Sequence, residues 1–163
     1  IFISHIHEEV SVANAVDGLI QPSLFEGKFC YVFLSSASRI RAGELWLDRL
    51  RKELDKAKVL IALLSPKSVA RPWVNFETGA AWVAGKTIIP VCFGGLLKED
   101  LPKPYSDFQA VSLEQEYNHL IDSVLEWIPD AIGHLGSTRA RSSLTIFDTK
   151  VANLMKAIKE SKK

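Results

Sequence analysis

The sequence predicts an α/β fold, namely a flavodoxin-like, doubly wound sheet of five parallel strands with helices on both faces and a C-terminal helical extension. Short β-rich runs alternate with longer helical patterns, which is typical of strand-helix-strand units. The strand runs are continuously apolar, as expected for strands covered on both faces. The 163 residues, 47% hydrophobic and 24% charged, suffice for one globular core. We expect each crossover between parallel strands to be right-handed.

Five short apolar runs are expected to form the strands. They comprise residues 1–4, 29–34, 59–64, 87–93 and 108–113. The third run has a clear end, because Ser65-Pro66 directly follows it and proline interrupts a strand. The segments after the second and fourth runs, residues 35–44 and 94–107, are expected to be loops.

Apolar residues that recur every three or four positions predict the helices. The first helix is expected to end at Gln21-Pro22, because proline lacks the amide hydrogen that a helix interior needs. A charged second helix carries an apolar stripe over residues 47–57, and a third closes near Gly85. A strongly amphipathic fourth helix is expected over residues 117–128.

A connector is expected after the first 128 residues. We therefore expect a domain over residues 1–128, a connector over residues 129–143, and a C-terminal helix over residues 144–163 that packs on the domain or leads to another one. The chain begins at Ile1, without a methionine and already in a strand pattern. We accordingly expect this chain to be a piece of a longer protein.

Composition excludes several function classes. The net charge of +1 provides no global field for nucleic acid or an anionic membrane. No apolar run approaches the length of a membrane span, and no basic-then-apolar leader precedes the first strand. Cys30 and Cys92 lie inside apolar runs, where a free thiol acts as a small hydrophobic residue. We therefore expect a cytoplasmic protein with no nucleic-acid partner and no membrane partner.

The most informative segment is residues 71–82, which places one carboxylate and two indoles on a helix that begins just past a strand. The helical period brings Trp73 and Glu77 onto one face. An acid beside flat aromatic surface suits a ligand that carries a cation and a ring. The alternative explanation is that the aromatic residues only pack and that Glu77 is a solvated acid in the first turn, where the helix dipole favours negative charge. Ligands of such sheets bind beyond the carboxyl ends of the strands, so the loops after Ser4, Leu34 and Leu64 are the prime site candidates.

Several segments in the correct order together resemble a Toll/interleukin-1 receptor (TIR) domain of the bacterial type. They are Phe2-Ile3-Ser4-His5 followed by Glu8-Glu9, Val32-Phe33-Leu34-Ser35-Ser36 leading to Gly43 and Trp46, residues 59–65, Trp73-Val74-Asn75-Phe76-Glu77, and residues 87–91. The resemblance covers about residues 1–128. No single segment is decisive, but five on their expected elements are a specific signal.

The resemblance implies an enzyme. Many members of this family cleave nicotinamide from NAD+ with a glutamate on the helix after the third strand, and Glu77 occupies that position. Trp73 matches the tryptophan that borders the nucleotide pocket, and Phe76 joins it as a substrate-binding candidate. The loop after the second strand, with Gly43 and Trp46, is implied to control access and to mediate self-association.

We thus expect an NAD+ glycohydrolase, or also a cyclase, that acts as an assembly-activated immune or signalling effector. NAD+ is the substrate, and no cofactor is expected. An activating partner or a further domain is implied. The alternative is a TIR scaffold that only assembles. Members of that kind commonly lack the glutamate, so Glu77 favours the enzyme.

The chemistry suits a single carboxylate. Breaking the bond between nicotinamide and ribose develops positive charge on the sugar, while the departing nicotinamide becomes neutral and needs no proton. Glu77 would accept hydrogen bonds from ribose hydroxyls and stabilise that charge. Trp73 would stack on the nicotinamide ring.

Donors for the two phosphates are expected near the strand ends. The candidates are Ser4, His5, Ser35, Arg39 and Arg41. Two alternatives remain open at this stage. The arginines are equally typical of a solvated surface, and His5 is equally typical of a structural histidine bonded to a backbone carbonyl.

Other kinds of site are not supported by the sequence. The cluster of His5, His7, Glu8 and Glu9 lies on a strand end and turn without a second cluster, so no metal site is expected. No Gly-x-Ser-x-Gly elbow is present for a serine hydrolase. The Gly-x-Gly-x-x-Gly motif of hydride-transfer enzymes is absent after the first strand.

Overall fold

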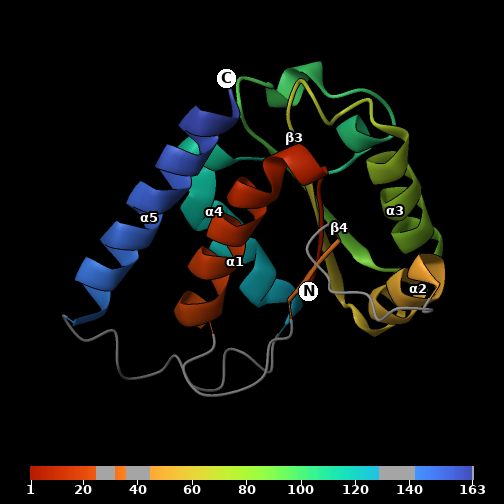
Figure 1. Ribbon diagram of the computed structural model, residues 1–163, viewed down its shortest axis with the longest axis horizontal. Coiled ribbons are helices and arrows are strands. Elements are labelled where there is room, and N and C mark those ends of the chain that lie inside the picture. The colour runs from red at the N-terminus through yellow and green to blue at the C-terminus, as the bar shows by residue number, and fades with distance from the viewer. Residues whose placement is uncertain (25–31, 36–44, 129–141, 163) are drawn as a thin grey trace.

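The computed structural model describes residues 1–24, 32–35, 45–128 and 142–162. Five parallel strands form one sheet in the order β2-β1-β3-β4-β5. Figure 1 shows this sheet in the middle of the molecule, with helices on both of its faces. The predicted flavodoxin-like, doubly wound fold is therefore confirmed.

The elements follow the expected alternation of strands and helices. The strands are β1 (Phe2–Ser4), β2 (Phe33–Leu34), β3 (Val59–Leu64), β4 (Thr87–Cys92) and β5 (Val111–Ser112). The α-helices are α1 (Val10–Leu24), α2 (Trp46–Lys56), α3 (Pro72–Val83), α4 (Leu113–Trp127) and α5 (Ser142–Ser161). Three short 3-10 helices complete the set, namely η1 (His7–Glu9), η2 (Lys98–Asp100) and η3 (Tyr105–Asp107).

The sheet separates two hydrophobic cores, because successive strand residues point to opposite faces. In β3, Val59, Ile61 and Leu63 pack toward α1, α4 and α5. Leu60 and Leu64 pack toward α2 and α3 on the other face. Figure 1 shows the same division, with α1, α4 and α5 together on one side and α2 and α3 on the other. Every residue of β3 is buried, as its continuous apolar run predicts.

The first helix is longer than predicted. It continues to Leu24 instead of stopping at Gln21-Pro22, so that prediction is wrong. Proline at position 22 has no amide hydrogen to donate to the carbonyl of Gly18, four residues earlier. The Lys150 ammonium of α5 donates to that carbonyl at 2.6 Å instead. A residue 132 positions away thus satisfies the backbone acceptor that the proline leaves open.

Two strands are shorter than the apolar runs that predict them. The fifth run, residues 108–113, yields only Val111–Ser112 as a strand, because Phe108 is the C-cap of η3 and Leu113 begins α4. The fourth strand ends at Cys92, one residue early. For the second run, Phe33–Leu34 is a strand, and residues 25–31, including Cys30, lie outside the described residues. Cys92 is a free, buried thiol, as expected.

The C-terminal helix packs against the rest of the chain. Leu154, Ala157 and Ile158 of α5 are buried in the core that also contains the apolar face of α1. At the end of α5, the Lys67 ammonium donates to the carbonyl of Ser161 at 2.7 Å. Figure 1 shows α5 running beside α1 with the C-terminus near the end of β3. Within the described ranges, none of the helices combines the length and the apolar character needed to cross a membrane.

Candidate active site

The candidate site lies at the carboxyl end of β1, where the strand order reverses. The chain leaves β1 toward β2 through α1 on one face of the sheet, and it leaves β3 toward β4 through α3 on the other. Such a switch point creates a crevice beyond the strand ends. Ser4 ends β1, Ser35 directly follows β2, and Ser65 directly follows β3. All three serines are buried.

Helix α3 brings a carboxylate to this edge. Pro72 occupies the first turn, where its fixed backbone angle suits a helix start, and Arg71 is the N-cap. Glu77 lies in the middle of α3 and points into the protein, with 0% of its surface exposed. The hydroxyl of Ser4 donates to Oε2 of Glu77 at 2.5 Å. The sequence placed both residues in the site, and the structure brings them into contact.

Glu77 is a strongly perturbed acid. Burial raises the pKa of this carboxyl from 4.5 to about 7, and the nearby polar hydrogens of Ser4, Trp73 and Ser35 partly oppose the rise; of these three, Ser4 is the one in hydrogen-bonding geometry. Oε1 of Glu77 is buried and has no hydrogen-bond partner in the described part of the chain. Perturbed carboxyls of this kind cluster at functional sites. Glu77 therefore has one oxygen held by the protein and one that a ligand hydroxyl can satisfy.

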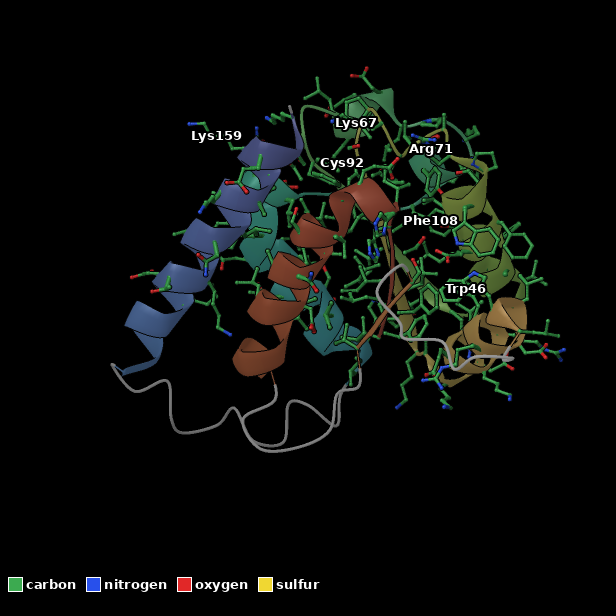
Figure 2. The ribbon with its side chains drawn as sticks, in the orientation of Figure 1. Trp46, Lys67, Arg71, Cys92, Phe108 and Lys159 are labelled. Atoms are coloured by element: carbon green, nitrogen blue, oxygen red, sulfur yellow. The ribbon has the colours of Figure 1, made fainter. Side chains whose placement is uncertain are left out.

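Aromatic rings lie over the first turns of α3. The Trp73 ring stacks on Trp46 of α2 at a centroid distance of 6.4 Å and on Phe76 at 5.5 Å. Trp73 is 37% exposed and Phe76 55% exposed. Figure 2 shows Trp46 where α2 and α3 meet. A ligand with a flat ring can thus reach aromatic surface one helical turn before Glu77, whereas the carboxyl itself becomes accessible only after a rearrangement.

His5 and Ser35 stabilise the turn that follows β1. The backbone amide of His5 donates to Oγ of Ser35 at 3.3 Å. The His5 ring is buried, and burial lowers its pKa, so the ring is neutral near pH 7. Its Nδ1 lies 3.1 Å from the carbonyl of Ile3 and must be the donor, since a carbonyl only accepts. In this arrangement the amide and ring of His5 are engaged by the protein, as is the hydroxyl of Ser4.

The remaining predicted site residues are Arg39, Arg41, Gly43 and Trp46. Arg39, Arg41 and Gly43 fall outside the described residues. Trp46 is the first residue of α2 and contacts the site through its stack on Trp73.

A second buried carboxyl, not predicted from the sequence, lies at the same edge of the sheet. Glu9, at the end of η1, accepts a hydrogen bond from the hydroxyl of Ser65. Burial raises the pKa of Glu9, and its Oε2 has no partner in the described ranges. Ser68 donates to the carbonyl of Leu63 and accepts from the amide of Ser65, which fixes this loop. Glu9 and Ser65 stood in two segments that the sequence analysis singled out, but nothing in their spacing paired them across 56 positions.

A small, mostly apolar pocket lies on another side of α3. It is lined by Asn75, Thr78, Gly79, Trp82, Ile88, Pro104, Tyr105 and Phe108. Figure 2 places Phe108 beside α3, away from the carboxyl ends where Lys67 is labelled. Because this pocket includes neither Glu77 nor Trp73, it is separate from the candidate site.

The fold and the site together define a class of protein: a flavodoxin-like α/β domain in which α3 carries a buried glutamate to the switch point of the sheet. The family model for the TIR domain matches residues 1–125. The chain belongs to the TIR domain family. A comparison with curated proteins finds none that matches. The family includes NAD+ hydrolases as well as scaffolds, and TIR domains commonly self-associate.

Proposed function

We propose that this TIR domain is an NAD+ glycohydrolase that releases nicotinamide, with Glu77 as its catalytic residue. One observation carries the proposal. A buried carboxyl with one oxygen bonded to Ser4 and the other without a protein partner lies one helical turn after an exposed indole. An unpartnered buried acceptor costs about 1–3 kcal/mol. Glu9 also has such an oxygen, so the exposed indole one turn before Glu77 is what distinguishes Glu77 from Glu9.

The reaction breaks the bond between C1 of the ribose and the nicotinamide nitrogen. The bonding electrons leave with nicotinamide, which becomes neutral, and the sugar becomes an oxocarbenium ion. Ionised Glu77 accepts a hydrogen bond from a ribose hydroxyl and stabilises the sugar charge at short range, in surroundings of low dielectric. Water then adds to the sugar carbon and loses a proton. No group has to protonate the leaving nicotinamide, so one carboxylate suffices.

The pKa of Glu77 predicts how the reaction depends on pH. Only the ionised carboxylate stabilises a cationic sugar, and burial raises the pKa of this group to about 7. The value of kcat/KM should therefore rise between pH 6 and pH 8, since this quantity reports the free enzyme.

Before the reaction, the substrate must also gain access to the buried carboxyl of Glu77. Glu77 has no exposed surface, so the substrate reaches it only when neighbouring groups rearrange. Trp73 lies beside this carboxyl, and its ring stacks on Trp46 of another helix. Self-association that displaces this stack would open the site. We therefore expect activity to be weak in dilute solution and to rise steeply with protein concentration.

The test is nicotinamide release from NAD+, separated by chromatography, with the protein dilute, concentrated and clustered on beads. Glu77→Gln should lower the rate roughly 100- to 1000-fold, the scale for loss of a group that stabilises transition-state charge. Glu9→Gln is the matched control, because it neutralises another buried, serine-bonded carboxyl and should retain activity. Equal losses in both variants would overturn the assignment of Glu77.

A TIR scaffold is the second candidate function, and one observation favours it. Large exposed hydrophobic side chains gather on α3 and at the start of α2, which gives an apolar surface for another domain. They are Leu45, Leu47, Trp73, Phe76, Trp82 and Val83. If the clustered wild-type protein never consumes NAD+, the scaffold replaces the enzyme.

A further inference from the structure

We propose that Ser4 is a positioning residue for Glu77: its hydroxyl fixes Oε2, so that Oε1 is the oxygen that receives the ribose hydroxyl. This inference rests on the proposed function and goes beyond it. It assigns different tasks to the two carboxylate oxygens. It also gives Ser4 a role other than the phosphate binding expected from its place in the sequence.

The first support is the rigidity of the donor. Ser4 is the last residue of β1, pairs with Ala62 of β3, and is 0% exposed. Strand β1 is hydrogen-bonded to β2 on one side and β3 on the other. The Ser4 hydroxyl is therefore held by the middle of the sheet. A glutamate has three rotatable side-chain bonds, so this anchor sets where its carboxylate points.

The second support is the asymmetry of the pairing. Oε2 of Glu77 accepts from Ser4 at 2.5 Å, across 73 positions of sequence. Oε1 is buried without a partner in the described part of the chain. The short bond ties α3 to the sheet, and only Oε1 keeps its capacity to accept a bond from a ligand. A preorganised acceptor of this kind needs little rearrangement during the reaction.

The third support is electrostatic. The pKa of Glu77 is raised by burial and lowered by three neutral neighbours, namely Ser4, Trp73 and Ser35. Among the described residues, two titratable groups lie near the pair. His5 adjoins Ser4 on the turn after β1, and Tyr105 of η3 has its pKa raised in part by the charge of Glu77. Both are neutral near pH 7, because burial lowers the pKa of His5 and raises that of Tyr105. Removing the Ser4 hydroxyl should therefore raise the pKa of Glu77 further.

The chain offers a matched control in the pair of Ser65 and Glu9. There too a buried serine after a central strand donates to a buried glutamate. Ser65 also accepts from the amides of Lys67 and Ser68, so its removal costs more structural hydrogen bonds than the removal of Ser4. A merely structural effect should thus be larger in Ser65→Ala. An effect on the carboxylate of Glu77 should appear only in Ser4→Ala.

The experiment measures kcat and KM for nicotinamide release between pH 5.5 and pH 9 in wild type, Ser4→Ala and Ser65→Ala. Removing one donor to a carboxylate should move the midpoint of kcat/KM upward by about one unit. Ser4→Ala should then be roughly fivefold slower than wild type at pH 7 and recover most of that loss by pH 9. Ser65→Ala should keep the wild-type midpoint.

A second readout needs no turnover. In protein labelled with carbon-13 at the glutamate carboxyls, the Glu77 resonance, assigned by its loss in Glu77→Gln, is titrated without NAD+. Its midpoint should move upward in Ser4→Ala and stay in place in Ser65→Ala. Should Ser4→Ala fail to fold, Ser4→Cys keeps the volume but donates more weakly, and the shift should have the same direction.

The outcomes separate this inference from the proposed function. If the wild type is active and Ser4→Ala has the same pH midpoints, the role of Ser4 is overturned and the proposed function is not. Equal shifts in Ser4→Ala and Ser65→Ala overturn it as well. A clustered wild type that releases no nicotinamide overturns the proposed function, whatever the carbon-13 titration shows.

Discussion

Replacing Glu77 by glutamine should make the protein more stable at neutral and alkaline pH. The carboxyl has 0% exposed surface, and its pKa is about 7 in the folded protein against 4.5 for the ordinary group. Between these two values the folded state holds a proton that the unfolded state has released. Stability of the wild type therefore falls as pH rises from about 4.5 to about 7.

The size of the effect follows from the interval between the two pKa values. At 1.36 kcal/mol per unit, the interval from 4.5 to about 7 corresponds to about 3 kcal/mol of free energy of unfolding. Glutamine keeps the side-chain size and carries no charge, so the variant escapes this loss. Its advantage over the wild type should grow by about 2–3 kcal/mol between pH 5 and pH 8.

The assay is urea unfolding at pH 5 and pH 8, followed by tryptophan fluorescence. Glu116→Gln is a control whose pH dependence lies below the measured pH values. The Glu116 carboxylate accepts from the Lys98 ammonium at 2.8 Å, and this bond lowers its pKa. Its contribution is fully present above the unfolded pKa of 4.5 and is lost only as pH falls below that value, so the disadvantage of Glu116→Gln should be the same at pH 5 and at pH 8. If the margin of Glu77→Gln over the wild type stays constant between the two pH values, the reasoning on Glu77 is refuted.

Three further predictions test the aromatic surface and the C-terminal helix. Trp73→Ala should raise KM for NAD+ by roughly 2- to 30-fold, the equivalent of a cation–π contact of about 0.5–2 kcal/mol, and an unchanged KM would remove this ring from the site. Leu154→Ala should lower the free energy of unfolding by about 2–5 kcal/mol in urea, because Leu154 has 0% exposed surface; a loss below 1 kcal/mol would mean that α5 packs loosely. Lys150→Met should cost about 1 kcal/mol by the same measurement, since it leaves the Gly18 carbonyl without its 2.6 Å donor, and a neutral result would contradict that account.

Most of the fold could be predicted because its elements carry local signals. Strand β3 is buried on both faces, and its apolar run and the proline at position 66 gave both of its ends. The end of α1 could not be predicted, because the donor that compensates for Pro22 is on α5, 132 positions from the Gly18 carbonyl that it satisfies. The fifth strand was overestimated because apolar residues before it pack as part of η3 and its cap.

The proximity of two candidate residues could be predicted from the sequence, but the contacts between elements could not. Trp73 and Glu77 lie four residues apart on a helix, so their proximity follows from the helical period. The bond from Ser4 to Glu77 joins two elements that the sequence does not pair, and the burial of the carboxyl depends on how α3 docks on the sheet. The pair of Ser65 and Glu9 escaped notice for the same reason.

The packing of α5 has a practical consequence for anyone who studies self-association in this protein. The family match ends at residue 125, whereas the apolar face of α1 is covered by Leu154, Ala157 and Ile158. A recombinant fragment trimmed to that match would present the uncovered face of α1 to water. Aggregation of such a fragment would then reflect the apolar face that the truncation exposes, and it could be mistaken for the self-association that we propose to activate the domain.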